Sequence, residues 1–217
     1  MQYKFYYNVQ NTYTELNYNE WNRYMAYKYF KAKGLTKAAF AGIWGNIWHE
    51  SFHGNPGQVE GGQIIPTTNS QGIPTSAAYR GGYGFIQWTD TSATSNKLLS
   101  YSISQDVAWY NGYLQCKLIY KELKNSEGWI PTPNYTYTTK EFMKLTDPEE
   151  AAAAYCYERE RGTWSDSRSE KAREAYEASY TSPPTEPTGP YTINNGPGGG
   201  GSGKLPIWKM WEFVKFH

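Results

Sequence analysis

The residues with the clearest capacity for chemistry lie in the run TKAAFAGIWGNIWHES, residues 36–51. Thr36 is the expected N-cap of a helix, and the run HGNPG after it is expected to end that helix. At about 100° per residue, large apolar side chains share one face of the helix. They are Phe40, Ile43, Trp44, Ile47 and Trp48. Glu50 projects at the edge of this face.

A carboxyl group in that position has a specific chemical use. Partial removal from water disfavours the ionised form of Glu50, so its pKa is expected to rise. A general acid that works near neutral pH needs such an environment. The alternative is an ordinary glutamate in the last helical turn, solvated or paired with a lysine. Periodicity leaves both interpretations open.

The same stretch contains HESFH, residues 49–53, which matches the H-E-x-x-H zinc pattern. On one helical face, His49 and His53 would bind the metal with Glu50 as the base beside it. A catalytic zinc needs a third protein ligand. The only other histidine, His217, lies far along the chain, and an acidic ligand such as Glu60 has no supporting helix. We therefore expect no metal or other cofactor, and a zinc metallopeptidase is the minor alternative.

A second chemical motif is GGYGFIQWT, residues 81–89. Its glycines permit tight backbone turns, and its aromatic residues can anchor the segment. Gln87 offers an amide donor and acceptor among apolar neighbours, which suits hydrogen bonding to a sugar hydroxyl or N-acetyl group. The alternative is a structural glutamine that ties two loops together.

Helical patterns dominate the elements that must position these motifs. Residues 54–96 are rich in Gly, Thr, Ser, Asn and Pro, and indicate loop with short extended pieces. Asp147 followed by Pro148 is typical of a helix start. We predict an α+β fold that is mostly α, with a small β or loop insertion after the helix that carries Glu50. Besides residues 36–51, the predicted helices cover residues 21–33, 105–124, 139–145, 148–162 and 167–180.

Composition excludes several classes of protein. The 217 residues have a net charge of +1, with 39% hydrophobic and 19% charged residues, which fits neither an acidic disordered chain nor a basic nucleic-acid-binding arm. No apolar run is long enough to span a bilayer, and the first twenty residues lack the features of a signal peptide. Cys116 and Cys156 could pair or could be buried thiols. The aromatic share of 18% fits sugar stacking as well as core packing.

The composition changes near residue 181. Residues 1–181 are expected to form the domain, residues 182–204 a flexible linker rich in Gly and Pro, and residues 205–217 an apolar aromatic tail. The tail is too short to span a membrane. We expect it to dock into a groove of a partner or of its own domain, with membrane-surface contact as the less favoured alternative. The GGGGSG stretch also fits an engineered join.

Three elements together carry a resemblance to a known family. AGIWGNIWHESFHGNPGQVEG, then GGYGFIQWT, then AAAAYCYERERG are similar, in that order, to the phage tail-tip lysozyme family of the lysozyme-like superfamily. The resemblance covers roughly residues 35–180. The chain departs from the family pattern after Gln-Trp-Thr, where DTSATSNK lacks the usual arginine.

The resemblance implies an activity and a location. The expected substrate is the glycan strand of peptidoglycan, cut between N-acetylmuramic acid and N-acetylglucosamine, and the expected location is a phage tail that acts at the host cell wall. Glu50 is then the general acid, steadied by Ser51. The apolar tail is expected to contact other tail proteins.

The resemblance also implies a set of substrate-binding residues. Tyr83 and Gln87 would line the sugar cleft, with Trp88 as packing or as a platform. Tyr155 and Glu158 would face the cleft from the late helix. For Glu158, an ion pair with a neighbouring arginine is an equal alternative.

The second carboxylate of the reaction stays open. An inverting hydrolase needs a base roughly 6.5–9.5 Å from the acid, and Asp90 and Glu60 are the available loop acids. Without such a base, the substrate's own 6-hydroxyl could attack, as in lytic transglycosylases. A non-catalytic peptidoglycan-binding tail module is the remaining alternative, because a fold does not by itself confer function.

Overall fold

The computed structural model describes residues 2–9, 18–61, 63–89 and 95–194. Along the chain, its strands and helices are β1 (Tyr3–Tyr6), α1 (Asn19–Ala32), α2 (Lys37–Glu50), α3 (Lys97–Gln105), α4 (Gly112–Asn125), α5 (Thr139–Phe142), α6 (Pro148–Ala154), η1 (Tyr155–Glu160), α7 (Asp166–Glu177) and β2 (Tyr191–Asn194). This confirms the predicted α-rich α+β class.

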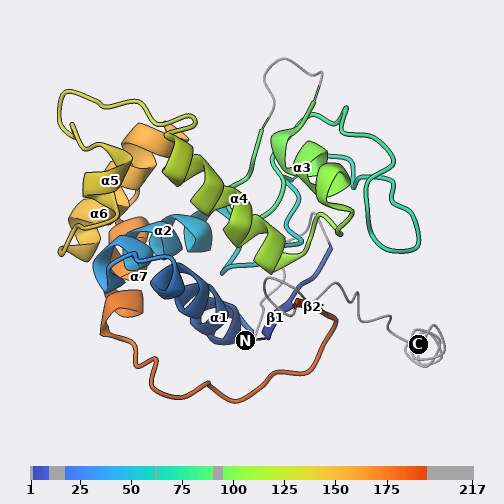
Figure 1. Cartoon of the computed structure of the whole chain (residues 1–217), viewed down its shortest axis with the longest axis horizontal. Coiled ribbons are helices and arrows are strands. Elements are labelled where there is room, and N and C mark those ends of the chain that lie inside the picture. The colour runs from blue at the N-terminus through green and yellow to red at the C-terminus, as the bar shows by residue number, and fades with distance from the viewer. Residues whose placement is uncertain (1, 10–17, 62, 90–94, 195–217) are drawn as a thin grey trace.

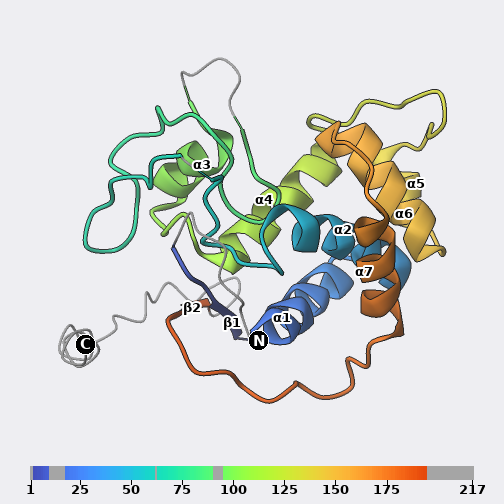
Figure 2. The same ribbon diagram turned by 180° about the vertical axis from the view of Figure 1, so that it is seen from behind.

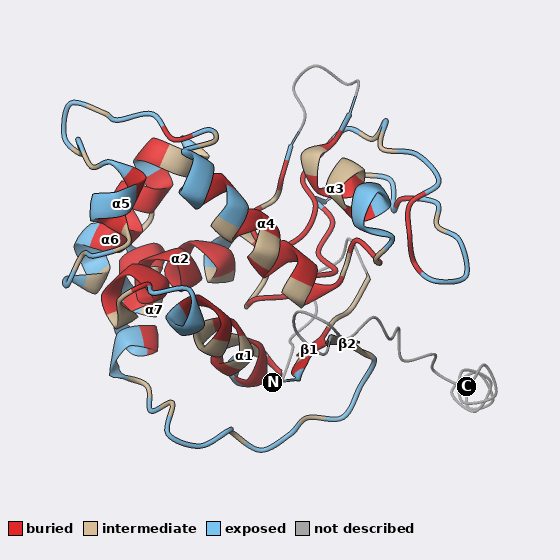
Figure 3. Cartoon of the chain, viewed as in Figure 1, coloured by how far each residue is buried: buried red, intermediate tan, exposed pale blue. Residues whose placement is uncertain are grey.

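The elements form two groups with α4 between them (Figures 1 and 2). Helices α1, α2, α5, α6 and α7 lie on one side, and α3 with the long loop after α2 lies on the other. Helix α2 is the buried centre of the helical group, and it packs most extensively against α7 and α6. Figure 3 shows that the buried residues concentrate on α2 and on the inner faces of its neighbours.

Two glycines allow α2 to approach its neighbours closely. A Cβ atom placed on Gly45 would lie 2.3 Å from the backbone oxygen of Arg168 in α7. One placed on Gly42 would lie 2.5 Å from the backbone of Ala151 in α6. Both distances are far shorter than a van der Waals contact, so larger residues would force the helices apart. The two glycines thus allow α2 to pack closely against α6 and α7.

Local capping signals account for most helix starts. The Thr36 side chain accepts a hydrogen bond from the amide of Ala39, as expected for an N-cap. Asp147 caps α6, and Pro148 occupies its first turn, as predicted.

The predicted helix over residues 105–124 is wrong in its first part. Helix α3 ends at Gln105, and Asp106 follows in the left-handed conformation with φ 53°. Asn111 then caps a new helix, α4, by accepting a hydrogen bond from the amide of Leu114. The helix predicted from residue 105 therefore begins at Gly112 instead, and α3, which precedes it, was not predicted.

The late helix also differs from the prediction. Its second half, η1, is a π-helix, in which hydrogen bonds span five residues instead of four. It ends at Arg161, which adopts the left-handed conformation. The wider turn changes which side chains of the YCYERERG run face the same way.

The loop after α2 contains short paired pieces, in line with the prediction. Val59 bridges to Tyr83, and Tyr83 bridges to Trp88. Gln115 of α4 holds this loop in place, because its side chain accepts a hydrogen bond from the amide of Phe85 and donates one to the backbone oxygen of Pro56.

The two-stranded sheet of the described residues lies outside the region after α2 in which the sequence predicted a small β or loop insertion. Strands β1 and β2 pair antiparallel, with Tyr3 opposite Asn194 and Tyr6 opposite Tyr191. An extended segment, orange in Figure 1, runs from α7 back to β2, and Glu186 on this path pairs with Lys4. The first part of the predicted linker thus contacts the domain, whereas the tail at residues 205–217 lies outside the described residues. The domain limits remain a prediction.

The structure also bears on the two cysteines and on the question of membrane-spanning segments. Cys116 and Cys156 are both free and buried. Among the described residues, no helix is long and apolar enough to cross a membrane.

The β1–β2 pairing generates a prediction about truncation. Removing residues 195–217 should leave the thermal unfolding midpoint unchanged, because both strands remain. Removing residues 182–217 deletes β2, and cross-strand pairs contribute roughly 0.2–1 kcal/mol each. We expect this longer truncation to lower the midpoint by several degrees, measured by circular dichroism. Equal midpoints for the two truncations would show that the pairing contributes nothing to stability.

Candidate active site

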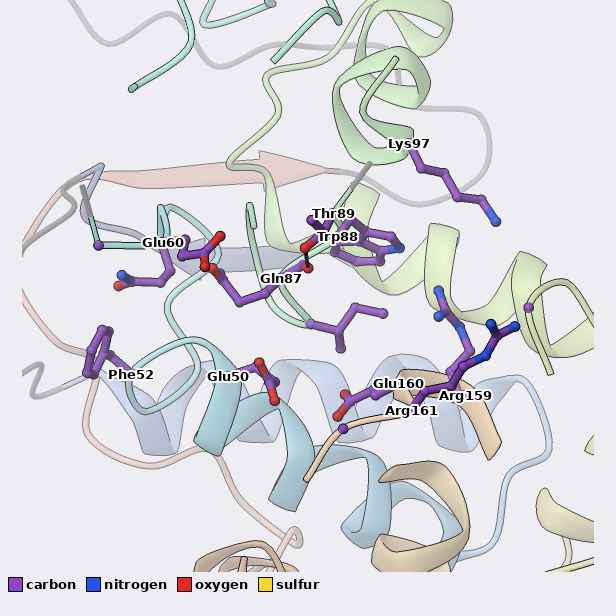
Figure 4. Close-up of a pocket in the computed structure, with 15 residues that line it drawn as sticks. Glu50, Phe52, Glu60, Gln87, Trp88, Thr89, Lys97, Arg159, Glu160 and Arg161 are labelled. Atoms are coloured by element: carbon purple, nitrogen blue, oxygen red, sulfur yellow. Dashed lines mark hydrogen bonds between the residues drawn. The ribbon is translucent and has the colours of Figure 1, made fainter. Parts of the chain in front are cut away.

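A cleft of about 720 Å³ lies between the two groups of elements. One wall comes from the end of α2 and from η1, and the other comes from the loop between α2 and α3 (Figure 4). The lining is rich in charged and polar groups, and it also contains the apolar or aromatic residues Phe52, Ile86 and Trp88. Its ionisable side chains are Glu50, Glu60, Lys97, Arg159, Glu160 and Arg161.

Glu50 lies on the helical wall, where the sequence indicated it. It is the last residue of α2, and its side chain is 25% exposed. An ion pair links its carboxylate to Arg168 of α7. The sequence suggested either an apolar environment or a lysine partner for Glu50. Its partner is instead an arginine from α7, a helix far along the chain.

Arg168 is the most connected side chain at the site. It is 2% exposed, and its guanidinium donates to Asn46 at 2.5 Å, to Glu160 at 2.7 Å and to Glu50. Asn46 lies one helical turn before Glu50 and also donates hydrogen bonds to the backbone oxygens of Gly42 and Ala152. One buried cation therefore joins α2, η1 and α7 behind the carboxyl groups that line the cleft.

Glu160 is the second carboxyl group at this floor. Its side chain is 6% exposed, and Figure 4 shows Glu50 and Glu160 pointing toward one another. Burial raises the pKa of Glu160 to about 8, with Arg168 opposing the rise and Glu50 adding to it. Its Oε1 atom is buried without a hydrogen-bond partner among the described residues. A protonated carboxyl group suits this environment better than an ionised one.

The facing wall carries the predicted loop residues. Gln87 has a positive φ of 48°, and its amide donates to the backbone oxygen of Gly84 at 2.7 Å. Glu60 accepts a hydrogen bond from the amide of Gly82 at 2.8 Å. Gln87, Glu60 and Trp88 line the cleft together, so the structure brings these predicted residues opposite Glu50 (Figure 4).

Glu122 of α4 connects the two walls of the cleft through its contacts with Trp88, Arg159 and Lys97. The indole of Trp88 is 4% exposed and donates to Glu122 of α4 at 3.2 Å. Glu122 also pairs with Arg159 at 2.6 Å and with Lys97 at 2.7 Å. Lys97 follows the DTSATSN run, so a lysine reaches the cleft from the stretch that lacks the family's arginine.

Four predicted residues do not line the cleft. Ser51 donates to the backbone oxygen of Ile47 instead of contacting the Glu50 carboxyl group. Tyr83 is fully buried, and its hydroxyl donates to backbone oxygens of the loop. Tyr155 is fully buried in the core. Of the two proposed second acids, Glu60 faces the cleft and Asp90 lies outside the described residues.

Glu158 is the fourth of these residues. It is fully buried, and the segment between α4 and α5 packs over it. Burial raises its pKa to about 7, against the opposing effect of the backbone amides of Thr132 and Tyr137. It forms no ion pair with a neighbouring arginine among the described residues.

The geometry required for the zinc alternative does not form. Helix α2 ends at Glu50, and His53 adopts a left-handed conformation with φ 68°, so His49 and His53 do not share a helical face. His49 contacts Ser167 at 3.0 Å, and the His53 ring stacks on Trp48. Within the described ranges, no group of three potential metal ligands occurs.

The segments that form the cleft also match a known protein family. The family model for phage tail lysozymes matches residues 22–178, which includes both walls of the cleft. The chain belongs to the phage tail lysozyme family. No curated protein matches it. Membership in this family confirms the resemblance and implies a peptidoglycan-cleaving, lysozyme-like function and glycosidase activity in general.

The sequence motifs did not identify Arg168 and Glu160 as residues of the site. A signal for Arg168 exists, because Arg168, Ala172 and Ala175 follow helical spacing and form the buried stripe of α7. An arginine aligned with buried alanines indicates a buried charge that needs an acidic partner. Glu160 gave no comparable signal, because its place in the cleft depends on the π-helical turn.

The two buried glutamates of η1 predict a pH dependence of stability. Their folded-state pKa values, about 7 for Glu158 and about 8 for Glu160, lie above the ordinary value of 4.5. The folded protein therefore keeps protons that the unfolded chain has released. The resulting stabilisation is complete below about pH 4.5 and is lost as the pH rises through 7 to 8.

Urea unfolding at pH 5 and pH 8.5 checks this expectation. The free energy of unfolding should fall between these values in the native protein. Glu158→Gln and Glu160→Gln should each reduce the fall, because glutamine cannot ionise. An unchanged pH dependence in both variants would contradict the prediction.

Proposed function

We propose that this chain cleaves the glycan strand of peptidoglycan between N-acetylmuramic acid and N-acetylglucosamine, with Glu50 as the general acid. The observation that carries the proposal is the position of Glu50, whose partly exposed carboxyl group faces Gln87 and Trp88 across a cleft of about 720 Å³. A cleft with a carboxyl group on one wall and amide and aromatic groups on the other suits a sugar chain.

In this mechanism each wall has a separate task. Gln87, Glu60 and the cleft-facing part of Trp88 hold sugar units. Glu50 protonates the glycosidic oxygen as the bond to the anomeric carbon breaks. Arg168 fixes the position of the carboxyl group, because its guanidinium is itself held by Asn46. Water or the substrate's 6-hydroxyl completes the reaction, so hydrolysis and transglycosylation are both compatible with this arrangement.

Replacing Glu50 is the direct test. Glu50→Gln should keep the fold and lower the cleavage of purified cell walls at least about a hundredfold, the usual scale of general acid catalysis. Glu177→Gln is a matched control, because Glu177 also ends a helix but is exposed and remote from the cleft. It should cleave at the native rate.

Near-native cleavage by Glu50→Gln would refute the mechanism. Native protein that binds cell walls without cutting them would instead favour the non-catalytic binding module. Mass spectrometry of the released fragments separates the two reactions, since hydrolysis leaves reducing ends and transglycosylation leaves 1,6-anhydro ends.

The metallopeptidase alternative has its own test. Because His49 and His53 face different partners, His53→Ala should cleave glycan strands at a rate close to that of the native protein, and chelators should not lower the rate. Metal analysis of the purified protein should find no stoichiometric zinc. Zinc bound at one per chain, lost together with activity in His53→Ala, would favour the metallopeptidase.

The biological setting is part of the same proposal. A lysozyme domain in a phage tail would open the host cell wall and aid genome entry. Residues 205–217 would attach the domain to other tail proteins, with contact to a lipid surface as the less favoured alternative. Cleavage of soluble wall fragments should then survive removal of residues 195–217, while attachment to tail proteins should weaken.

A further inference from the structure

We propose that Glu160 is the second carboxyl group of the active site, and that Glu50 and Glu160 share a single proton across Arg168. The inference rests on the proposed glycosidase function and deepens it. It gives Glu160 the role of a positioning residue that acts through Glu50, and it identifies the source of the proton that the general acid needs.

The geometry is a bridge of one guanidinium between two carboxyl groups. Nη1 of Arg168 donates to Glu160 at 2.7 Å, and Nη2 donates to Glu50. Arg168 is held in this orientation by Asn46, and Gly45 lets the α7 backbone approach α2 closely. Both carboxyl groups line the same cleft and point toward each other (Figure 4).

The charges at this bridge do not balance when both carboxyl groups are ionised. Arg168 contributes one positive charge, whereas Glu50 and Glu160 together would contribute two negative charges in a largely buried space. Two close carboxyl groups in such a place titrate as a pair, because the first ionisation opposes the second. One proton on the pair restores neutrality with Arg168.

The surrounding groups do not supply the missing positive charge. Arg159 opposes the rise of the Glu160 pKa, but its guanidinium forms its ion pair with Glu122, which also pairs with Lys97. Burial and Arg168 lower the pKa of His49 against the opposing effect of Glu50, which disfavours the positively charged form of this histidine. Arg161 also lines the cleft, but it is exposed to solvent and forms no ion pair with Glu50 or Glu160 among the described residues. Burial raises the pKa values of the Tyr155 phenol and the Cys156 thiol, and neither group carries a positive charge.

The Glu160 carboxyl group has a place for the proton. Oε2 accepts from Arg168, while Oε1 is buried without a hydrogen-bond partner among the described residues. A buried ionised oxygen without a donor is unfavourable, and protonation removes that cost. Glu50, with the more exposed side chain, is the member of the pair that meets the substrate.

The proton balance of the reaction follows from this pairing. The pair donates its proton through Glu50 to the glycosidic oxygen, and the bond between that oxygen and the anomeric carbon breaks. Both carboxyl groups are then ionised against Arg168. The attacking hydroxyl, from water or from the substrate, forms the new bond to the anomeric carbon. Its proton returns to the pair.

The first experiment measures kcat/KM for wall-fragment cleavage against pH in the native protein and in Glu160→Gln. The second negative charge holds the shared proton on the pair, and glutamine does not provide that charge. The alkaline limb of the profile should move down by about one pH unit or more, the scale that defines coupled sites. Activity at the acidic optimum should stay within about tenfold of native. Glu177→Gln, the exposed helix-end control, should leave the limb in place.

A purely structural role for Glu160 predicts another result. In that case Glu160→Gln would lower activity by the same factor at every pH, with the alkaline limb unmoved. Either this outcome or an unchanged profile would overturn the proposal.

The second experiment does not depend on activity. NMR of the glutamate side-chain carboxyl carbons follows each titration directly. In the native protein, Glu50 and Glu160 should each show two shared titration steps. In Glu160→Gln, Glu50 should titrate in one step at lower pH. Independent one-step titrations in the native protein would overturn the shared proton even if the protein cleaves cell walls, while an inactive protein with coupled titrations would overturn the proposed function alone.

Discussion

The buried guanidinium of Arg168 is the interaction on which the rest of the site depends. It is almost completely removed from water, so every hydrogen-bond donor directed at a partner counts toward its stability. Asn46 and Glu50 of α2 and Glu160 of η1 provide those partners. The contact requires the close approach of α2 and α7 that Gly45 permits. The packing of α2 against α7 and the placement of the carboxyl groups therefore depend on the same contacts.

Helix α4 extends this dependence to the loop wall. Its buried Gln115 fixes the backbone at Pro56 and Phe85, on both sides of the long loop. Two turns further along, the carboxylate of Glu122 accepts from Trp88 of the loop wall and from Arg159 of the helical wall. The loop has little regular secondary structure of its own, and α4 gives it a defined position relative to Glu50.

Local signals in the sequence determined much of this fold. Thr36 and Asp147 mark helix starts through short-range hydrogen bonds, so their effect could be predicted from neighbouring residues. Glu50 and Gln87 could be predicted as cleft residues because their motifs have a distinctive composition. The limits of α3 and α4 were not predicted correctly, because the helix expected from residue 105 begins only at Gly112 after the Asn111 cap, and α3 was not predicted.

The rest of the site depends on contacts between distant segments. Arg168 lies 118 residues after Glu50, and no local sequence pattern predicts the hydrogen bond between them. The family resemblance implied Tyr83 and Tyr155 as cleft residues, and aromatic groups suit both sugars and cores. Their burial shows that core packing uses them here. An aromatic-rich chain makes this distinction hard to draw from composition alone.

The π-helical turn of η1 sets the direction of Glu160. A π-helix holds an additional residue in its turn compared with an α-helix over the same path. If residues 155–160 relaxed into an ordinary α-helix at the same length, Glu160 and the residues beyond it would rotate by about 100° around the helix axis and away from Arg168. Deletion of one residue from this turn would instead leave their directions nearly unchanged, because the residue removed is the additional one. The pairing of Glu160 with Arg168 should therefore survive a one-residue gap in this turn during evolution.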